Sequence, residues 1–215
     1  MKKAITAAAA MCALVTGAHA FENEPTGFRG ITWGTKVGDI QRLYQVHSLT
    51  FNQAAGAAGT LFGLPAGVRP ESLQASGVTA FVKTDEPLEL AQSPLQSLRY
   101  IFSDGELVAV VAAYVDQAPP PNLMTPRGPS VNAKDKVLST LKERFGAPTD
   151  PKTLKAVLFD KTDRTTYMGA TSLVVNECDK RTRQCLLGFA SSPGWIKLTE
   201  RLSPGGPGAT KATGF

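Results

Sequence analysis

Apolar residues recur along this chain in two patterns, short runs and helical spacing. The clearer pattern is the series of short runs. Such runs, bounded by turn residues, are typical of β-strands. Leu107–Val115 is apolar throughout, which indicates a central strand covered on both faces. Asp104 and Gly105 precede it and give a strong hairpin signal. The pattern predicts strands at Thr79–Lys83, Leu95–Phe102, Leu107–Val115, Ala156–Phe159, Thr165–Gly169, Ser172–Glu177 and Cys185–Ala190.

Helical spacing of apolar residues appears in three other places. The strongest helix follows residue 130, with Asn132 or Ser130 as its cap and Gly146 at its end. Its apolar face consists of Val137, Leu138, Leu141 and Phe145. The spacing also predicts a last helix over Ser192–Leu202 and a short helix that begins at Thr35 and carries Val37, Ile40, Leu43 and Tyr44.

Three segments lack a clear period. Asn52–Gly77 is rich in Gly and Ala, and we expect irregular structure there, with room for a helical turn. Its apolar patch Leu61–Leu64 either tucks under the sheet or marks a contact surface. The Pro-rich run 117–130 predicts an exposed connection, because Pro cannot occupy a helix or sheet interior. Residues 203–215 predict a disordered tail.

The order of these elements predicts an α+β fold. Helices would pack their apolar stripes on one face of an antiparallel sheet. We expect a single domain over residues 21–202. The order is also consistent with two degenerate helix-then-strands units, about 28–116 and 131–202, with 117–130 as the Pro-rich connection.

Residues 1–20 have the three-part layout of a secretory signal peptide. Lys2 and Lys3 precede an Ala-rich apolar run, which closes on the small residues Ala18 and Ala20 around His19. The run is shorter than the roughly 20 residues that a membrane span requires. We therefore expect cleavage after Ala20, no stable membrane span, and export to a Gram-negative periplasm, with full secretion as the alternative.

Cleavage would change both the charge and the cysteine count. The formal net charge falls from +5 to +3, because the leader holds two lysines and no acid. That charge is too small for a nucleic-acid footprint. Cys12 leaves with the leader, so Cys178 and Cys185 remain as an even pair in an oxidising compartment. We expect a disulfide at the neck of a hairpin, which stabilises the fold by about 2.5 kcal/mol.

Candidate chemistry is sparse. His47 is the histidine that remains after cleavage, and no G-x-S-x-G motif accompanies it. Asp160 and Asp163 come nearest to a carboxylate cluster, but we expect them to form a turn. No residue set predicts a catalytic centre, a metal site or a cofactor. The possible contact residues are Lys180, Arg181 and Arg183, which give the stapled hairpin a basic tip.

Three motifs carry a resemblance to a known family. Phe28–Thr35 reads F-R-G-I-T-W-G-T, Tyr100–Leu107 reads Y-I-F-S-D-G-E-L, and Leu141–Pro148 reads L-K-E-R-F-G-A-P. In this combination the chain resembles a group of uncharacterised exported bacterial proteins, although Arg144 stands where their last motif has Lys. The resemblance implies a small periplasmic or envelope α+β fold and supplies no catalytic residues.

Two hypotheses about function remain open at this point. The first is an exported, non-enzymatic envelope protein that acts by protein–protein interaction with an unknown envelope or secreted partner. The second is a small-ligand binder or a hydrolase that uses carboxylates or His47. A deep pocket with converging acids would favour the second hypothesis, and a filled core beneath a flat surface would favour the first.

Overall fold

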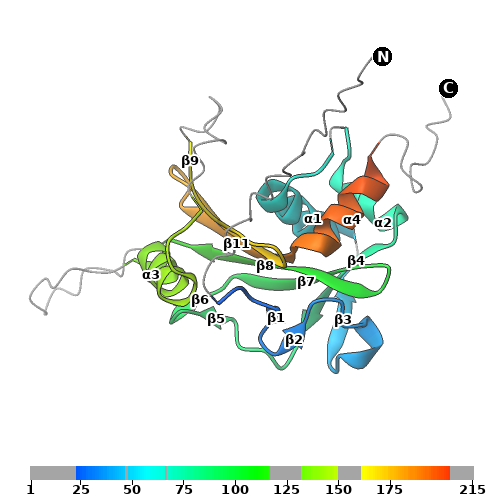
Figure 1. The fold of residues 1–215 in the computed structure, drawn as a ribbon, viewed down its shortest axis with the longest axis horizontal. Helices are drawn as coiled ribbons and strands as arrows, with labels where there is room; N and C mark the ends of the chain where they lie inside the picture. Colours follow the sequence, from blue (N-terminus) through cyan, green and yellow to red (C-terminus); the bar gives the residue numbers. More distant parts are fainter. Residues whose placement is uncertain (1–22, 47, 66, 117–131, 150–160, 204–215) are drawn as a thin grey trace, which may run out of the picture.

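A seven-stranded antiparallel sheet forms the centre of the computed structural model, which describes residues 23–46, 48–65, 67–116, 132–149 and 161–203. Its strands follow the order β3-β4-β7-β8-β11-β10-β9 (Figure 1). Their bounds are β3 Leu43–Val46, β4 Val78–Lys83, β7 Ser97–Ser103, β8 Glu106–Val115, β9 Thr162–Met168, β10 Ser172–Asp179 and β11 Gln184–Ser191.

Helices and two small hairpins cover this sheet. The helices in the described ranges are α1 Ser48–Phe62, α2 Pro70–Ala75, α3 Ala133–Phe145 and α4 Ser192–Leu202, with a 3-10 turn at Val37–Asp39. The small hairpins are β1 Gly27–Phe28 with β2 Ile31–Thr32, and β5 Glu89–Leu90 with β6 Ser93–Pro94. The predicted α+β class is confirmed.

The predicted central strand is confirmed as β8. All residues from Leu107 to Ala112 are buried, and β8 pairs with β7 on one side and with β11 on the other. Asp104 and Gly105 join β7 to β8 with φ of 53° and 79°, as a tight two-residue hairpin requires. The register shifts between Ile101 and Phe102, so that β8 carries an extra residue there.

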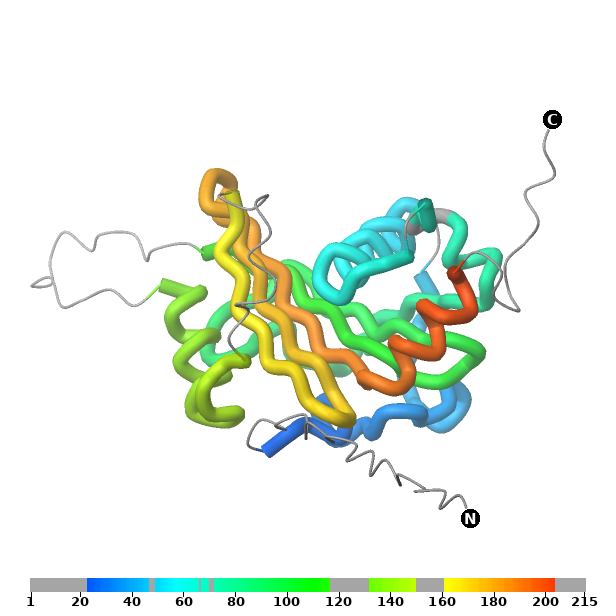
Figure 2. The backbone as a smooth tube through the Cα atoms, turned by 45° about the horizontal axis from the view of Figure 1, so that its top comes forward, coloured from blue at the N-terminus to red at the C-terminus, as the bar shows by residue number. Residues whose placement is uncertain are grey.

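The two faces of the sheet lie in separate hydrophobic cores. β8 contributes Leu107, Val110, Ala112 and Tyr114 to one core, and Val108, Ala109 and Val111 to the other. The first core is covered by α3 and by residues 28–40, and the second by α1, α2 and α4. Three helices therefore share one face, while α3 packs on the opposite face of the sheet (Figure 2).

The helix expected from Thr35 to Tyr44 is wrong. A single 3-10 turn occupies Val37–Asp39, and Leu43–Val46 forms the edge strand β3. Tertiary pairing overrides the helical spacing here: the Val37 amide donates to the Gly105 carbonyl at 2.8 Å, and β3 pairs with β4. Arg42 adopts a φ of 59°, which a helix does not allow.

The irregular structure expected over Asn52–Gly77 is also wrong, because α1 and α2 occupy much of it. Alanine is the best helix former, and the small side chains of Ala54, Ala55 and Ala58 are buried against the sheet. Leu61 is fully buried in the same core, so the apolar patch Leu61–Leu64 tucks under the sheet.

The remaining helices match their predicted signals. Asn132 caps α3 by accepting a hydrogen bond from the Asp135 amide at 2.8 Å, and Gly146 follows the helix with a φ of 76°. α4 spans the predicted Ser192–Leu202. The predicted strand at Ala156–Phe159, the connection 117–130 and the tail from 204 onward lie outside the described residues.

Two arginines fasten helices to the sheet. Arg164 of β9 donates to the carbonyls of Thr60 and Leu61 at the end of α1 and pairs with Glu177 at 2.6 Å. Arg201 of α4 donates to the Ser76 carbonyl at 2.8 Å and to the Ser103 hydroxyl at 3.0 Å, and it pairs with Asp104. A guanidinium suits this task because it donates several hydrogen bonds in one plane.

The substitution Gly188→Ala is expected to lower the free energy of unfolding by about 1–3 kcal/mol, because overpacking forces α1 away from β11. A Cβ at position 188 would lie 2.4 Å from Phe62 Cζ and 2.7 Å from Leu61 Cδ1. Urea unfolding followed by circular dichroism measures the change.

Gly38→Ala is the matched control, because a Cβ there meets no atom within 4 Å. We expect it to change stability by less than about 0.5 kcal/mol. Equal losses for both variants would contradict the close approach of α1 to β11.

Candidate functional site

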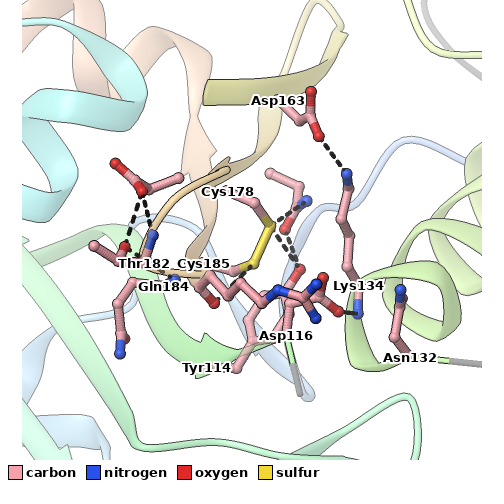
Figure 3. Close-up of a disulfide and its surroundings, with 12 residues drawn as sticks. Tyr114, Asp116, Asn132, Lys134, Asp163, Cys178, Thr182, Gln184 and Cys185 are labelled. Carbon is pink, nitrogen blue, oxygen red and sulfur yellow. Dashed lines mark hydrogen bonds and ion pairs between the residues drawn. A yellow bond between two sulfur atoms is a disulfide. The ribbon is translucent and has the colours of Figure 1, made fainter. Parts of the chain in front are cut away.

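The predicted disulfide is confirmed, and it closes the β10–β11 hairpin. Cys178 and Cys185 lie directly opposite each other in the register, with their Cα atoms 4.1 Å apart (Figure 3). Opposed residues of an antiparallel pair approach closely, so a bridge fits between them. Both cysteines are buried, with exposed fractions of 3% and 0%.

The loop beyond this bridge is folded by its own hydrogen bonds. The Asp179 carboxylate accepts from the backbone amides of Arg181 at 2.9 Å and Thr182 at 2.6 Å, and from the Thr182 hydroxyl at 3.0 Å. These bonds, those from Thr182 above all, hold the pKa of Asp179 below its ordinary value. The Arg183 amide donates to the Asp179 carbonyl at 2.9 Å, and Arg183 adopts a φ of 57°.

The same loop is bonded to the chain on both sides of it. The Lys180 amide donates to the Lys161 carbonyl at 2.9 Å, and the Asp116 amide donates to the Arg183 carbonyl at 2.9 Å. These bonds bring the loop beside the end of β8 and the start of β9. The backbone that carries the three predicted contact residues is therefore fixed in place.

A charged cluster surrounds the hairpin neck, and sequence reasoning missed most of it. The Asp116 carboxylate accepts from the Lys134 amide at 3.0 Å, at the first turn of α3. The Lys134 ammonium reaches Asp163 at 2.6 Å (Figure 3). Lys180 lies 3.5 Å from the same carboxylate. The hydrogen bond from Lys134, helped by the charges of both lysines, holds the pKa of Asp163 below its ordinary value.

A buried polar pair lies beneath the bridge. The Tyr114 hydroxyl donates to Asn176 Oδ1 at 2.8 Å and lies 3.6 Å from Cys178 Sγ. Tyr114 and Asn176 are 0% and 1% exposed, and burial raises the pKa of Tyr114 above its ordinary value. The phenol therefore stays neutral, and its hydrogen bond supports the inner face of the hairpin.

The three predicted contact residues lie together at this end of the sheet, and all three are exposed. Lys180 lies near Asp163, whereas no ion pair joins the guanidinium of Arg181 or Arg183 to another described residue. Asp163 lies in β9 and not in the expected turn, because it continues the pairing with β10 opposite Cys178. Asp160 and His47 lie outside the described residues.

The cluster joins residues from four separate parts of the sequence, so no local sequence motif predicts it. Asp116, Lys134, Asp163 and Lys180 meet because β8 and β10 end, and α3 and β9 begin, at the same edge of the fold. One local signal was available: an Asp that precedes Thr182 by three residues is typical of a side chain that caps a turn.

A cavity of about 460 Å³ lies elsewhere, between residues 23–32 and the end of α3. Its wall includes the aromatic residues Phe28, Phe145 and Phe189, with Arg144 beside them. Among the described residues of this lining Glu24 is the one carboxylate, and it accepts from the backbone amides of Thr171 and Ser172.

Within the described ranges, no group of three or more His, Cys, Asp or Glu residues is arranged to hold a metal ion. None of the described helices has the length and apolar character needed to cross a membrane. Comparisons with family models, curated proteins and solved structures gave no match to this chain.

Replacing both bridged cysteines, as C178A/C185A, is expected to lower the free energy of unfolding by about 2.5 kcal/mol, because the bridge restricts the unfolded chain. Urea unfolding of the oxidised protein measures the loss. Reductant added during unfolding should produce a similar loss in the wild type and leave the double variant unchanged. If reductant does not change the unfolding free energy of the wild type, the bridge does not stabilise the fold as expected.

Asp163→Asn tests the ion cluster by its pH dependence. The native pKa of Asp163 lies below its ordinary value of 3.8, so its contribution is present above that pH and is lost as pH falls through the native pKa. The side chain is 45% exposed, so the contribution is at most about 1 kcal/mol.

We expect wild type and Asp163→Asn to differ in unfolding free energy at pH 6 and to converge near pH 2, as urea titrations at both pH values would measure. A difference that persists unchanged at the lower pH would show that packing, and not the ionised carboxylate, is responsible.

Proposed function

We propose that this chain is an exported bacterial envelope protein that acts by binding another protein, and that the periplasm is its destination. The observation that carries the proposal is the disulfide between Cys178 and Cys185, both buried at the neck of one hairpin. Such bonds persist in oxidising compartments and are rare in the cytosol. The signal-peptide layout of residues 1–20 and the resemblance to exported bacterial proteins support the same destination.

Binding is favoured over catalysis by what the charged side chains do. Asp116, Asp163 and Asp179 lie at the stapled end, the end of the sheet that carries the bridged β10–β11 hairpin and its loop. Each accepts hydrogen bonds that hold backbone or lysine groups in place. Such bonds are a structural use of carboxylates, whereas a catalytic acid or base needs a pKa near the working pH. Exposed cations on a fixed loop instead suit recognition of a partner.

A small-ligand site is the second candidate, and the 460 Å³ cavity favours it. Its volume is within the range of known ligand sites, and its aromatic wall beside Arg144 suits an apolar molecule that bears a carboxylate. Benzoate and phenylacetate are suitable probes, measured by ligand-observed NMR. Binding that Arg144→Ala weakens would support this candidate, and no binding to either probe would count against it.

Export predicts three linked measurements on the full chain produced in a Gram-negative host. The protein should appear in the periplasmic fraction, its mass should correspond to residues 21–215, and its two remaining cysteines should resist alkylation after denaturation. Denaturation is needed because both cysteines are buried in the native protein.

A chain that lacks residues 2–20 is the control, and we expect it to stay in the cytosol with alkylatable cysteines. Recovery of the unprocessed full chain from the cytosol would overturn the proposal.

A further inference from the structure

At the stapled end the acidic side chains have bonding partners within the fold, whereas two of the basic side chains form no ion pair with a described residue. The carboxylates of Asp116, Asp163 and Asp179 are each occupied by a backbone amide or a lysine, as described above. Arg181 and Arg183, in contrast, make no side-chain ion pair with a described residue. Segments 117–131 and 150–160 adjoin this end in the sequence and carry three cations and two acids between them, so they add no surplus of negative charge.

The backbone of both arginines is already ordered. Arg181 donates its amide to Asp179, and Arg183 uses its amide on Asp179 and its carbonyl on Asp116. The disulfide closes the hairpin directly beneath them. A partner that binds here would therefore have to order only the two side chains, which reduces the entropic cost of association.

We propose that the three cations of the stapled end, Lys180, Arg181 and Arg183, bind an acidic segment of a partner protein. This inference rests on the proposed function, because it names the surface and the kind of partner. A guanidinium binds a carboxylate through two parallel hydrogen bonds, and this geometry adds specificity to the charge attraction. Lys180 contributes less, because it lies 3.5 Å from Asp163.

A lipid surface fits this end less well. Large exposed apolar side chains assist insertion into headgroups, and those of the described residues lie elsewhere, at Tyr44, Leu49, Leu88, Met168 and Ile196. Each cation near an anionic membrane contributes about 1 kcal/mol, so two arginines would give only weak attachment. A protein partner adds buried contact area to the same charges.

The first experiment is photo-crosslinking in cells that make the full chain. One crosslinking residue replaces Gln184, which is exposed beside the two arginines, and another replaces Ile196, which is exposed on α4. We expect an adduct from position 184 whose partner peptide, identified by mass spectrometry, is rich in Asp and Glu. R181E/R183E should reduce that adduct at least about tenfold.

The double variant R69E/K197E is the matched control, because it makes the same charge change at exposed cations outside the stapled end. We expect it to leave the adduct unchanged. Reversing the acidic residues of the identified partner peptide to Arg should restore the adduct with R181E/R183E, which a merely unfolded variant would not allow.

The second experiment uses the purified mature protein and two defined probes. Polyglutamate peptide should shift the NMR amide signals of residues 180–184, and added salt or R181E/R183E should abolish the shifts. Vesicles of pure phosphatidylglycerol should not sediment the protein. Sedimentation with vesicles but no response to the peptide would overturn the proposal in favour of a lipid headgroup, and no response to either probe would overturn it outright.

The two proposals fail in different ways. If the chain is not exported, fractionation and the mass of the N-terminus reveal it, and the proposed function fails. If the chain is exported and yields protein adducts only from position 196, the proposed function survives and the stapled end is not the contact surface.

Discussion

The antiparallel pairing of β8 with β11 is the constraint on which the rest of the fold depends. It runs from Val115 opposite Gln184 to Ala109 opposite Ala190. Within the described sheet it joins the strands that precede residue 116 to those that follow residue 161. Because both strands are covered on both faces, neither can be shifted by one residue without moving its side chains into the wrong core.

This central pairing also limits what can pack above it. β8 and β11 carry the small residues Ala109, Gly188 and Ala190 on the face that α1 covers. The buried residues of α1 in the same core include several alanines. Small side chains on both surfaces allow the helix backbone to lie close to the sheet. Many short van der Waals contacts then stabilise the packing, although the side chains themselves are small. The larger residues of β8, Leu107 and Tyr114, lie on the α3 face.

The sequence predicted those elements whose signals are local. The β7–β8 hairpin has its Asp-Gly turn, α3 has a cap and a terminal glycine, and the bridged hairpin has its paired cysteines. α1 was missed because its alanines and glycines resemble a loop in composition, and their burial under the sheet decides the structure. β3 was misread as helix because Val37, Ile40 and Leu43 do face the core, although they reach it from a 3-10 turn and an edge strand.

The candidate site was predictable to a smaller extent. The bridge and the three cations were visible in the sequence, whereas the meeting of Asp116, Lys134 and Asp163 depends on long-range packing. The carboxylates of Asp116, Asp163 and Asp179 look like free acids in the sequence, but in the structure they accept hydrogen bonds from amides or an ammonium group. Their engagement, and not their number, sets the charge that the stapled end presents to solvent.

The position of the disulfide follows from the same physics. The residues of the loop, Lys180 to Arg183, are all polar, so burial cannot hold this loop in place. It lies where the β8–β11 pairing ends, and the ends of paired strands open most readily. Hydrogen bonds to Asp179 shape the loop, and the covalent bridge at the pair of β10 and β11 nearest the loop keeps these strands together. Oxidation of Cys178 and Cys185 therefore adds a covalent constraint to the hydrogen bonds that hold the loop of Arg181 and Arg183, and such bridges persist in oxidising compartments.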